Sequence, residues 1–279
     1  MDLRIVNTCN NNCLYCLESE LRKKDKFISL NTIFQQIKKN SVRDVISFYW
    51  WNPLLHPDLL EIIRFAKNEW YKSIWLLTNS YWLDDEKIFE YERAWLTTLG
   101  IYFNSFSEPN HSAVNWNWIS YLTLLKNIDL VARSKILLKI IIHVNNLNIK
   151  TLYKDIITLH KRFWVTHIDL VNYFPFDKPY SNREKLQYFL PENKIPIYLL
   201  FKVLEKFNIK HRFMKFSKEF FLWLNHFYDF NVSVKSQIWE EDNVILSSES
   251  IPQCFIDKRC QFCFLKDICK FANDYTYEI

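Results

Sequence analysis

The residues of this 279-residue chain that are best suited to chemistry are its seven cysteines, which stand in two tight groups. The first group lies in the segment TCNNNCLYCLE and spaces Cys9, Cys13 and Cys16 as C-x3-C-x2-C. Three thiolates on so short a loop can bind three irons of a [4Fe–4S] cluster and leave the fourth iron open for a reactive ligand. The alternative is a structural zinc loop that a distant ligand completes.

The second group lies in the segment PQCFIDKRCQFCFLKDIC. Its members are Cys254, Cys260, Cys263 and Cys269. Four thiolates this close together saturate one metal site, which is either a second [4Fe–4S] cluster or Zn²⁺. An odd number of cysteines, together with the lack of a signal-peptide apolar core in MDLRIVNTC, favours metal ligation over disulfides.

The elements that must position these groups follow from the hydrophobic periodicity. Apolar runs of strand length alternate with helix-periodic segments. We expect strands over residues 3–7, 43–49, 72–78, 98–104, 136–144 and 166–173, and helices over 30–39, 57–68, 84–94, 118–132 and 149–162. Such alternation predicts right-handed βαβ units around a parallel sheet. The first cysteine group then directly follows the first strand, at the edge of the sheet where α/β folds bind ligands.

The pattern changes in the last part of the chain. Prolines punctuate the segment 174–196, a helix is expected near 197–207, and a short strand is possible at 212–216. The strand-helix repeat stops near residue 210. We therefore predict one α/β domain over residues 1–210 and a small cysteine-rich extension over 211–279.

The first cysteine group resembles the signature of the radical S-adenosylmethionine (radical SAM) superfamily, CxxxCxxC with an aromatic residue before the last cysteine. Tyr15 fills the aromatic place. The superfamily carries a GGEP-like motif after its second strand, where backbone groups bind the amino end of SAM. Four residues stand at that place: Trp50, Trp51, Asn52 and Pro53. Asn52 departs from the family pattern, because an amide accepts a hydrogen bond but supplies no charge. The resemblance covers roughly residues 1–175.

Weaker matches follow the next three expected strands. They are Thr78 and Asn79, which are similar to the family's TNG segment, then Asn104 and Ser105, and then Asn145. The resemblance implies that these polar residues contact SAM, and each is equally a residue that favours a turn or a strand end. His56, which precedes Pro57, is expected to help start a helix rather than to act as a base.

The resemblance implies a partial (β/α)6 TIM-like barrel, an α/β fold, with a C-terminal extension of the twitch or SPASM kind. It also implies that a [4Fe–4S] cluster binds SAM, and that an electron from a donor such as flavodoxin or ferredoxin cleaves SAM to a 5′-deoxyadenosyl radical. That radical abstracts hydrogen from a peptide or a small biosynthetic intermediate. Two alternatives stay open: a non-catalytic Fe–S or zinc module, and a radical enzyme that modifies RNA.

Charge and hydropathy restrict the partners. Lysine and arginine exceed aspartate and glutamate by five, but the basic residues are scattered, so we interpret them as solvated faces rather than a nucleic-acid site. No uncharged apolar run is long enough to span a membrane. We expect a cytoplasmic protein without membrane association.

The glycine content is anomalous. Average usage gives about 20 glycines in a chain of this length, whereas this chain has one glycine, Gly100, and 11 tryptophans. Trp70 and Trp164 each stand between an expected helix and an expected strand, where a residue with positive φ ends a helix. Trp82 and Trp95 stand in similar turns.

We interpret many of these tryptophans as glycines in the living cell, encoded by a gene that uses UGA for glycine but translated here with UGA as tryptophan. Tryptophan pays a steric cost at positive φ that glycine does not pay. Two indoles at residues 50 and 51 would also block the close backbone approach that a ligand needs there. The alternative is a tryptophan-rich core, in which each indole is buried and its N–H group is hydrogen-bonded.

Overall fold

The computed structural model describes residues 1–16, 26–49, 51–115, 121–172, 181–188, 191–214, 216 and 220. Trp50 and the second cysteine group lie outside the described residues. The predictions that concern them are therefore not tested by the structure.

A seven-stranded sheet runs through the described residues, and each strand lies beside the strand that precedes it in the sequence. The strands are β1 (Asp2–Leu3), β2 (Val45–Phe48), β3 (Ser73–Thr78), β4 (Thr98–Tyr102), β5 (Leu137–His143), β6 (His167–Val171) and β7 (Lys210–Met214). The pairs from β1 to β5 are parallel, as βαβ units require. This topology confirms the predicted class, a partial TIM-like α/β barrel, and β7 adds a strand to the six that were expected in it.

The helices fall close to their predicted bounds where the hydrophobic period is clear. They are α1 (Leu30–Lys39), α2 (Leu59–Asn68), α3 (Asp85–Arg93), α4 (Glu108–Val114), α5 (Tyr121–Ala132), α6 (Leu152–Phe163), α8 (Arg183–Leu186) and α9 (Lys194–Lys206). The periodicity does not predict α4, α8 or the 3-10 turns η2 (Pro53–Leu55) and η3 (Pro191–Asn193), because each is too short to show a helical period. None of the described helices is long and apolar enough to cross a membrane.

The chain forms two compact units. The first comprises Met1–Cys13, Glu18–Ile141 and Thr158–His167, and the second comprises Leu14–Leu17, Ile142–Ile157 and Ile168–Ile279. The boundary that the sequence places at residue 210 stays a prediction, because most residues after it lie outside the described ones.

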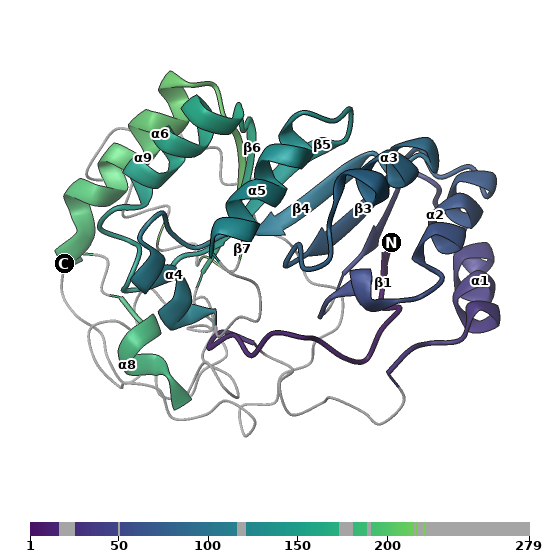
Figure 1. Ribbon diagram of the computed structural model, residues 1–279. Coiled ribbons are helices and arrows are strands. Elements are labelled where there is room, and N and C mark those ends of the chain that lie inside the picture. Colours follow the sequence, from purple (N-terminus) through teal and green to yellow (C-terminus); the bar gives the residue numbers. More distant parts are fainter. Residues whose placement is uncertain are drawn as a thin grey trace. The chain divides into compact units, whose positions relative to one another are not determined.

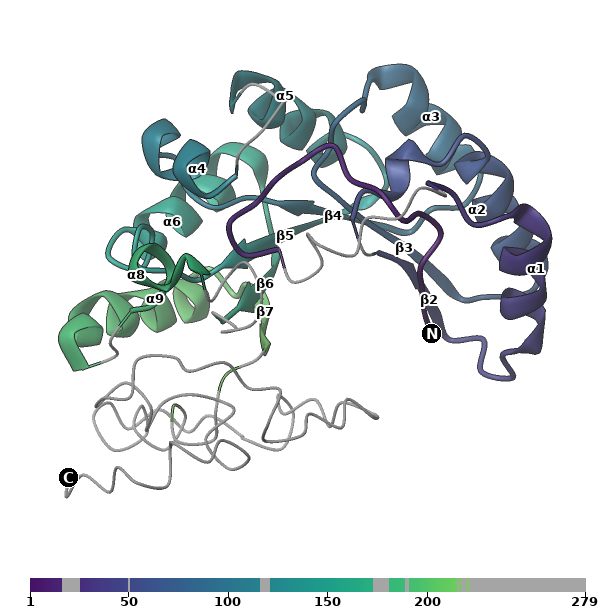
Figure 2. The ribbon, with the colours of Figure 1, turned by 90° about the horizontal axis from the view of Figure 1, so that it is seen from below.

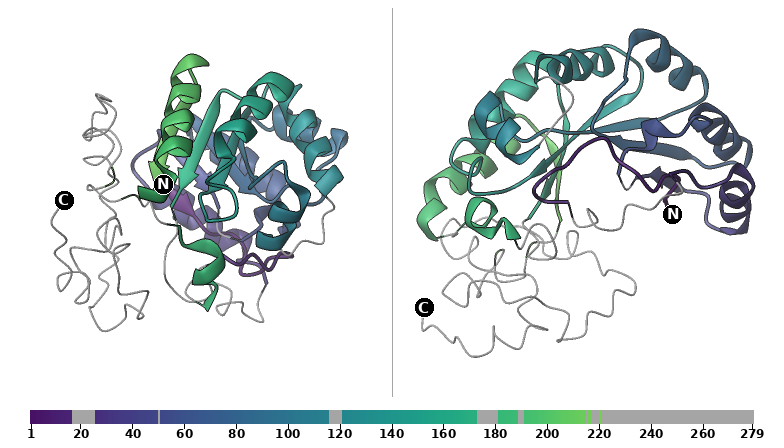
Figure 3. Two further views of the ribbon diagram at one scale, coloured as in Figure 1. Left: turned by 90° about the vertical axis from the view of Figure 1, so that its left-hand side faces the viewer. Right: turned by 60° about the horizontal axis from the view of Figure 1, so that its bottom comes forward.

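In the first unit, helices α1, α2 and α3 cover one face of strands β2 to β4 (Figures 1 and 2), and Figure 3 shows the same covering from two further sides. Alternate residues of these strands have no exposed surface; they are Ile46, Phe48, Ile74, Leu76, Leu99 and Ile101. The apolar stripes of α1 and α2 are buried in the same way through Ile33, Ile37, Ile62 and Ile63. Burial of this apolar surface is the main favourable term in folding.

The intervening residues of β3 to β5 make a contact that spans three strands. The Lys139 ammonium of β5 lies 4.2 Å from the ring centroid of Trp75 on β3. Gly100 of β4 pairs with Lys139 in the sheet. A Cβ atom on Gly100 would lie 3.1 Å from Ile141 Cδ1 and 3.2 Å from Leu77 Cγ, so a larger residue would displace both side chains. Glycine at this position therefore supplies space.

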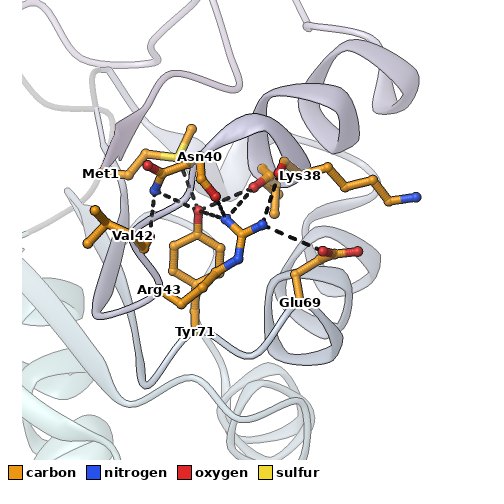
Figure 4. Close-up of polar contacts among 8 residues, drawn as sticks. Met1, Lys38, Asn40, Val42, Arg43, Glu69 and Tyr71 are labelled. Atoms are coloured by element: carbon orange, nitrogen blue, oxygen red, sulfur yellow. Dashed lines mark hydrogen bonds and ion pairs between the residues drawn. The ribbon is translucent and has the colours of Figure 1, made fainter.

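Arg43, which precedes β2, holds the carboxyl end of α1 (Figure 4). Its guanidinium donates to the main-chain oxygens of Ile37 at 2.8 Å and Lys38 at 2.9 Å, and to the Tyr71 hydroxyl at 3.0 Å. Glu69 lies 3.7 Å away as its ion-pair partner. The last carbonyls of a helix lack donors within the helix, so a cation there satisfies them and complements the helix dipole.

In the second unit, an ion pair joins β7 to β6. Arg212 Nε donates to Asp169 Oδ1 at 2.8 Å, and Arg212 Nη2 donates to Asp169 Oδ2. The Asp169 side chain is almost wholly buried, so removal of the arginine would leave a buried charge. Phe213 of β7 stacks on Phe201 of α9 with ring centroids 5.1 Å apart. These contacts fix a strand that the sequence shows only as a possibility.

Seven residues other than glycine have positive φ in the described part of the chain, and five of them are tryptophans. The five are Trp51, Trp70, Trp82, Trp95 and Trp164, with φ between 53° and 78°. Ser80 and Asn208 complete the set. The structure therefore has the left-handed backbone that the sequence predicts after the helices that precede Trp70 and Trp164.

Two of these tryptophans end helices in the pattern that Asn208 uses. After α2, the N–H groups of Trp70 and of the next residue bond to carbonyls of the last helical turn at 3.0 and 3.3 Å. These are the two bonds of a Schellman motif, which requires a left-handed residue. Trp95 takes the same place after α3, and Asn208 takes it after α9. Asparagine visits this conformation readily, and tryptophan does not.

The side chains at these turns do not form a tryptophan-rich core. The exposed fractions are 83% for Trp70, 77% for Trp164, 55% for Trp82 and 53% for Trp95. Trp75 differs from them, because it lies within β3 and its indole N–H donates to Ser73 Oγ at 2.8 Å. Position 75 suits an indole, whereas positions 70, 82, 95 and 164 suit a residue without a side chain.

Replacement of Trp70 by glycine is expected to stabilise the chain by about 1 kcal/mol, because the left-handed conformation costs a residue with a Cβ about 1–2 kcal/mol. The matched control is Trp75→Gly, which should destabilise by about 3 kcal/mol through the cavity and the lost contact with Lys139. Urea unfolding measures both changes. A loss of stability at position 70 would contradict the steric argument.

A second prediction concerns His111 of α4, which is 2% exposed and packs against Phe103 and Tyr121 with ring centroids 5.9 and 5.6 Å away. Burial lowers the pKa of His111 to about 4. The unfolded state therefore binds its proton near pH 6.5 and the folded state only near pH 4, so stability falls as pH drops through this window.

Between pH 6.5 and pH 5 the loss from this one group is expected to be about 2 kcal/mol of unfolding free energy. The His111→Gln protein cannot take up this proton, so its unfolding free energy should fall by about 2 kcal/mol less over the same pH interval. Denaturant unfolding at the two pH values gives the comparison. Equal pH profiles for the two proteins would show that His111 is not held neutral by the fold.

Candidate functional site

The first cysteine group lies on the segment that follows β1. Cys9, Cys13 and Cys16 form no disulfide with one another, and each is partly exposed. The main-chain N–H of Asn11 donates to Cys9 Sγ at 3.3 Å, and Asn11 Nδ2 donates to Cys13 Sγ at 3.9 Å. Asn11 itself is buried. Donors beside a sulfur stabilise the thiolate form, which is the form that ligates metals.

The donor set fits an iron–sulfur cluster by its chemistry. Soft thiolates are the ligands of such clusters, and three of them on one short loop leave one iron open. Among the described residues, no three His, Cys, Asp or Glu side chains lie in an arrangement that could hold a metal ion. The fit therefore rests on the spacing of the thiols and on the N–H groups at two of their sulfurs.

Asn10, between the first two cysteines, joins this segment to the carboxyl ends of β2 and β3. Its Oδ1 accepts from Asn52 Nδ2 at 2.9 Å and from Asn79 Nδ2 at 3.0 Å. Asn52 Oδ1 in turn accepts from the Thr78 hydroxyl at 2.6 Å. In Figure 1, the purple segment after β1 passes the ends of these strands. The structure thus brings together three predicted site residues, Asn52, Thr78 and Asn79, and adds Asn10 to them.

Trp51 occupies the turn after β2 and has a φ of 53°. Its indole Nε1 is buried and has no hydrogen-bond acceptor among the described residues. The Arg4 guanidinium lies 4.8 Å from its ring centroid. Pro53, which is buried, begins the turn η2. A buried indole N–H without an acceptor carries a desolvation cost, so this turn accommodates tryptophan poorly.

His56 has a structural role. It is 4% exposed, and its Nδ1 accepts from the main-chain N–H of Asp58 at 3.1 Å. Nε2 therefore carries the proton and donates to the Ile28 oxygen at 3.1 Å. Both ring nitrogens are used just ahead of α2, in agreement with the helix-start role expected from the sequence.

The polar residues after β4 and β5 shape the loops that contain them. Asn104 and Ser105 are each 1% exposed, and Ser105 Oγ accepts from the Ser107 N–H at 3.0 Å. Asn145 Nδ2 donates to the His143 oxygen at 2.8 Å, and its Oδ1 accepts from the main-chain N–H two residues on at 2.9 Å. For Ser105 and Asn145, these bonds are those of turn-forming residues.

Tyr15, the aromatic residue before Cys16, stacks on His143 at the end of β5. The ring centroids are 3.8 Å apart and the planes lie 16° from parallel. Burial lowers the pKa of His143 to about 3, so the imidazole is neutral near pH 7. A neutral ring stacks on the phenol without bringing a charge to the cysteine segment.

Sequence reasoning missed Asn10, Asn11 and His143. The signal for the first two was their place between Cys9 and Cys13, where any polar side chain lies close to the thiols. His143 carried no such signal, since its partner Tyr15 is far away in the sequence.

Comparison with known proteins gives the family. The family model described as the Radical SAM superfamily matches residues 3–157, more than half of the chain. No curated protein matches the sequence.

Several solved structures share the fold. SuiB from Streptococcus suis, solved with S-adenosylmethionine bound, aligns with a TM-score of 0.58 and 13% identity over 76% of this chain and 49% of its own. AnSMEcpe with bound AdoMet aligns with a TM-score of 0.58 and 16% identity over 76% and 64%. Methylornithine synthase (PylB) aligns with a TM-score of 0.58 and 10% identity over 76% of this chain and 63% of its own. The chain spans about half to two thirds of the length of these proteins.

At such identities the likeness shows the fold alone, whereas the family match includes the cysteine segment itself. The matched residues also contain the turn after β2 and the Asn10 hydrogen bonds. The chain therefore belongs to the radical SAM superfamily of enzymes, which implies a [4Fe–4S] cluster and S-adenosylmethionine as its cofactors.

Proposed function

We propose that this protein cleaves S-adenosylmethionine reductively at a [4Fe–4S] cluster and modifies a peptide by hydrogen abstraction. The observation that carries the proposal is the three-cysteine segment, with N–H donors at two sulfurs and hydrogen bonds to the ends of β2 and β3. The bound cluster supplies the electron that splits SAM into methionine and a 5′-deoxyadenosyl radical. A one-electron donor such as flavodoxin or ferredoxin renews that electron, in the cytoplasm, where thiols stay reduced.

The chain's own residues hold the reactants and exclude water. Cys9, Cys13 and Cys16 ligate the cluster, and Asn11 donates toward two of the sulfurs. The main chain of the segment 50–53, which the family's motif matches, is expected to receive the amino end of SAM. Ser105, which shapes the loop after β4, and Asn145, which shapes the loop after β5, are further residues that we expect to contact SAM.

A peptide is the substrate class that the comparisons favour. SuiB was solved bound to its precursor peptide SuiA, and anSMEcpe was solved with AdoMet and a Kp18Cys peptide. Methylornithine synthase shares the fold to the same degree, so a small biosynthetic intermediate is the alternative. We assign the second cysteine group, Cys254 to Cys269, to a second Fe–S cluster, with zinc as the other candidate.

Anaerobic reconstitution with iron and sulfide tests this function. The full chain should bind about eight irons, the content of two [4Fe–4S] clusters, and should form 5′-deoxyadenosine from SAM under a strong reductant. Cys13→Ala should lose about four irons and all 5′-deoxyadenosine formation, because the reactive cluster loses a ligand.

The matched control is Cys263→Ala in the second group. It should also lose about four irons but keep SAM cleavage. Iron assay and chromatography of the nucleoside measure both quantities. An intact chain that binds zinc through its last cysteines and never cleaves SAM would be a non-catalytic metal module instead.

We further propose that the tryptophans at left-handed turns are glycines in the organism, encoded by UGA. Five of the seven residues with positive φ support this, as do the exposure of Trp70 and Trp164 and the buried Trp51 N–H that has no acceptor in the described part of the chain. Glycine at residue 51 would also open the backbone to SAM. Trp75 is a genuine tryptophan, because its N–H is satisfied and its ring lies under Lys139.

The codons decide this proposal. We expect UGA at residues 51, 70, 82, 95 and 164, and UGG at residue 75. Peptide mass spectrometry of the protein from its own host should read glycine at the first five positions and tryptophan at the last. UGG codons at residues 51 and 70 would refute the recoding.

A further inference from the structure

The hydrogen-bond chain around Asn10 has a direction that the main chain sets. At one end, the N–H of Ser80 donates to Thr78 Oγ1 at 3.0 Å. The Thr78 hydroxyl donates its own proton to Asn52 Oδ1, 2.6 Å away. Asn52 must then present its Nδ2 to Asn10 Oδ1, at 2.9 Å. The last step follows because an amide that presents its oxygen to one partner presents its NH₂ group to the other.

The other end of this hydrogen-bond network also shows that the Asn10 oxygen is an acceptor. The N–H of Tyr81 donates to Asn79 Oδ1 at 3.0 Å, so Asn79 presents its Nδ2 to the Asn10 oxygen at 3.0 Å. Two donors thus converge on one acceptor of the cysteine segment. Reversal of the Asn79 amide would oppose its NH₂ group to the Tyr81 N–H, and reversal of the Asn52 amide would oppose its oxygen to the Asn10 oxygen.

We infer that Asn10 and Asn52 are positioning residues that fix the segment between Cys9 and Cys13 to the ends of β2 and β3, and that Asn52 does not accept the ammonium group of SAM. Asn52 has no exposed surface, and both of its polar atoms bond within the chain, the oxygen to the Thr78 hydroxyl and the NH₂ group to Asn10. The inference rests on the proposed function, because it assigns these residues within that SAM site. It explains why residue 52 is an amide rather than a carboxylate, since an amide both accepts from Thr78 and donates to Asn10, whereas a carboxylate can only accept.

The two roles for residue 52 predict opposite results for Asn52→Asp. If residue 52 binds the ammonium group, the added charge strengthens a charge-assisted hydrogen bond and SAM binds more tightly. If residue 52 positions the segment, aspartate places an oxygen against the Asn10 oxygen, and the bond at 2.9 Å is replaced by repulsion. SAM should then bind roughly tenfold more weakly.

The experiment measures two quantities on the full chain. The first is SAM affinity of the reconstituted protein by calorimetry. The second is the rate at which Cys9 and Cys13 are alkylated in the metal-free protein, followed peptide by peptide with mass spectrometry. The cysteines of the second group serve as the internal reference. Asn68→Asp, the same change at an exposed residue of α2, is the control for charge alone.

For Asn52→Asp and Asn10→Leu we expect alkylation of Cys9 and Cys13 to rise by roughly fivefold, the factor that one lost hydrogen bond gives. Asn10→Asp keeps an oxygen that accepts from both amides, so its alkylation should not exceed that of the unaltered chain. Asn68→Asp should change neither quantity. If alkylation rises in Asn10→Leu but stays at the level of the unaltered chain in Asn10→Asp, simple destabilisation of the fold does not explain the difference.

Tighter SAM binding by Asn52→Asp with unchanged alkylation would overturn the inference. Equal alkylation of Asn10→Leu and the unaltered chain would overturn it as well. If the unaltered chain binds no SAM but the alkylation rates differ as expected, the positioning role stands and the proposed function fails. Should Asn52→Asp not fold, the contrast between Asn10→Leu and Asn10→Asp decides the question.

Discussion

The return from helix to strand at the ends of α2, α3, α6 and α9 depends on a left-handed residue, which is Trp70, Trp95, Trp164 or Asn208. The main-chain bonds after α2, α3 and α9 are those of the Schellman motif, and after α6 the Trp164 N–H bonds to the His160 oxygen at 2.9 Å, the single bond of the related left-handed motif. These tight returns lead into β3, β4, β6 and β7, and parallel pairing brings the carboxyl ends of neighbouring strands to one edge. The site at that edge therefore depends on backbone positions that contribute no side chain to it.

A protein needs glycine either at a left-handed turn or where packing leaves no room for a side chain, and in the described part of this chain the two needs fall at different positions. Gly100 does not have a positive φ, and its role is to leave room for Ile141 and Leu77. The left-handed turns in the described residues hold tryptophan, serine or asparagine instead. If the chain were simply rich in tryptophan, tryptophan should also be common inside the strands. Among the described strands, Trp75 is the one tryptophan.

The sequence predicted the parts of the fold that repeat and the parts of the site that lie close together along the chain. Helices α1 and α2 and strands β3 and β6 were predictable because their apolar periods extend over several residues. Helix α4 was not, since its seven residues are mostly polar and start from a Ser107 cap that resembles an ordinary turn. Strand β7 depends on the Asp169 ion pair, a contact between distant residues that no local pattern reveals. Trp50 and the second cysteine group stay predictions.

Asn52 illustrates the limit of reading function from a motif position. Its place after β2 predicts a contact with SAM, and its hydrogen bonds, which the motif does not predict, lead to Thr78 and, through Asn10, to the cysteine segment. An acid at this place would carry a negative charge toward a segment that must hold three thiolates, and like charges in a buried site raise the cost of ionisation. A neutral amide avoids that cost, and the N–H groups of Asn11 donate to two of the sulfurs. The amide at residue 52 and the asparagines between Cys9 and Cys13 thus have the same effect, because neither adds negative charge beside the thiolates.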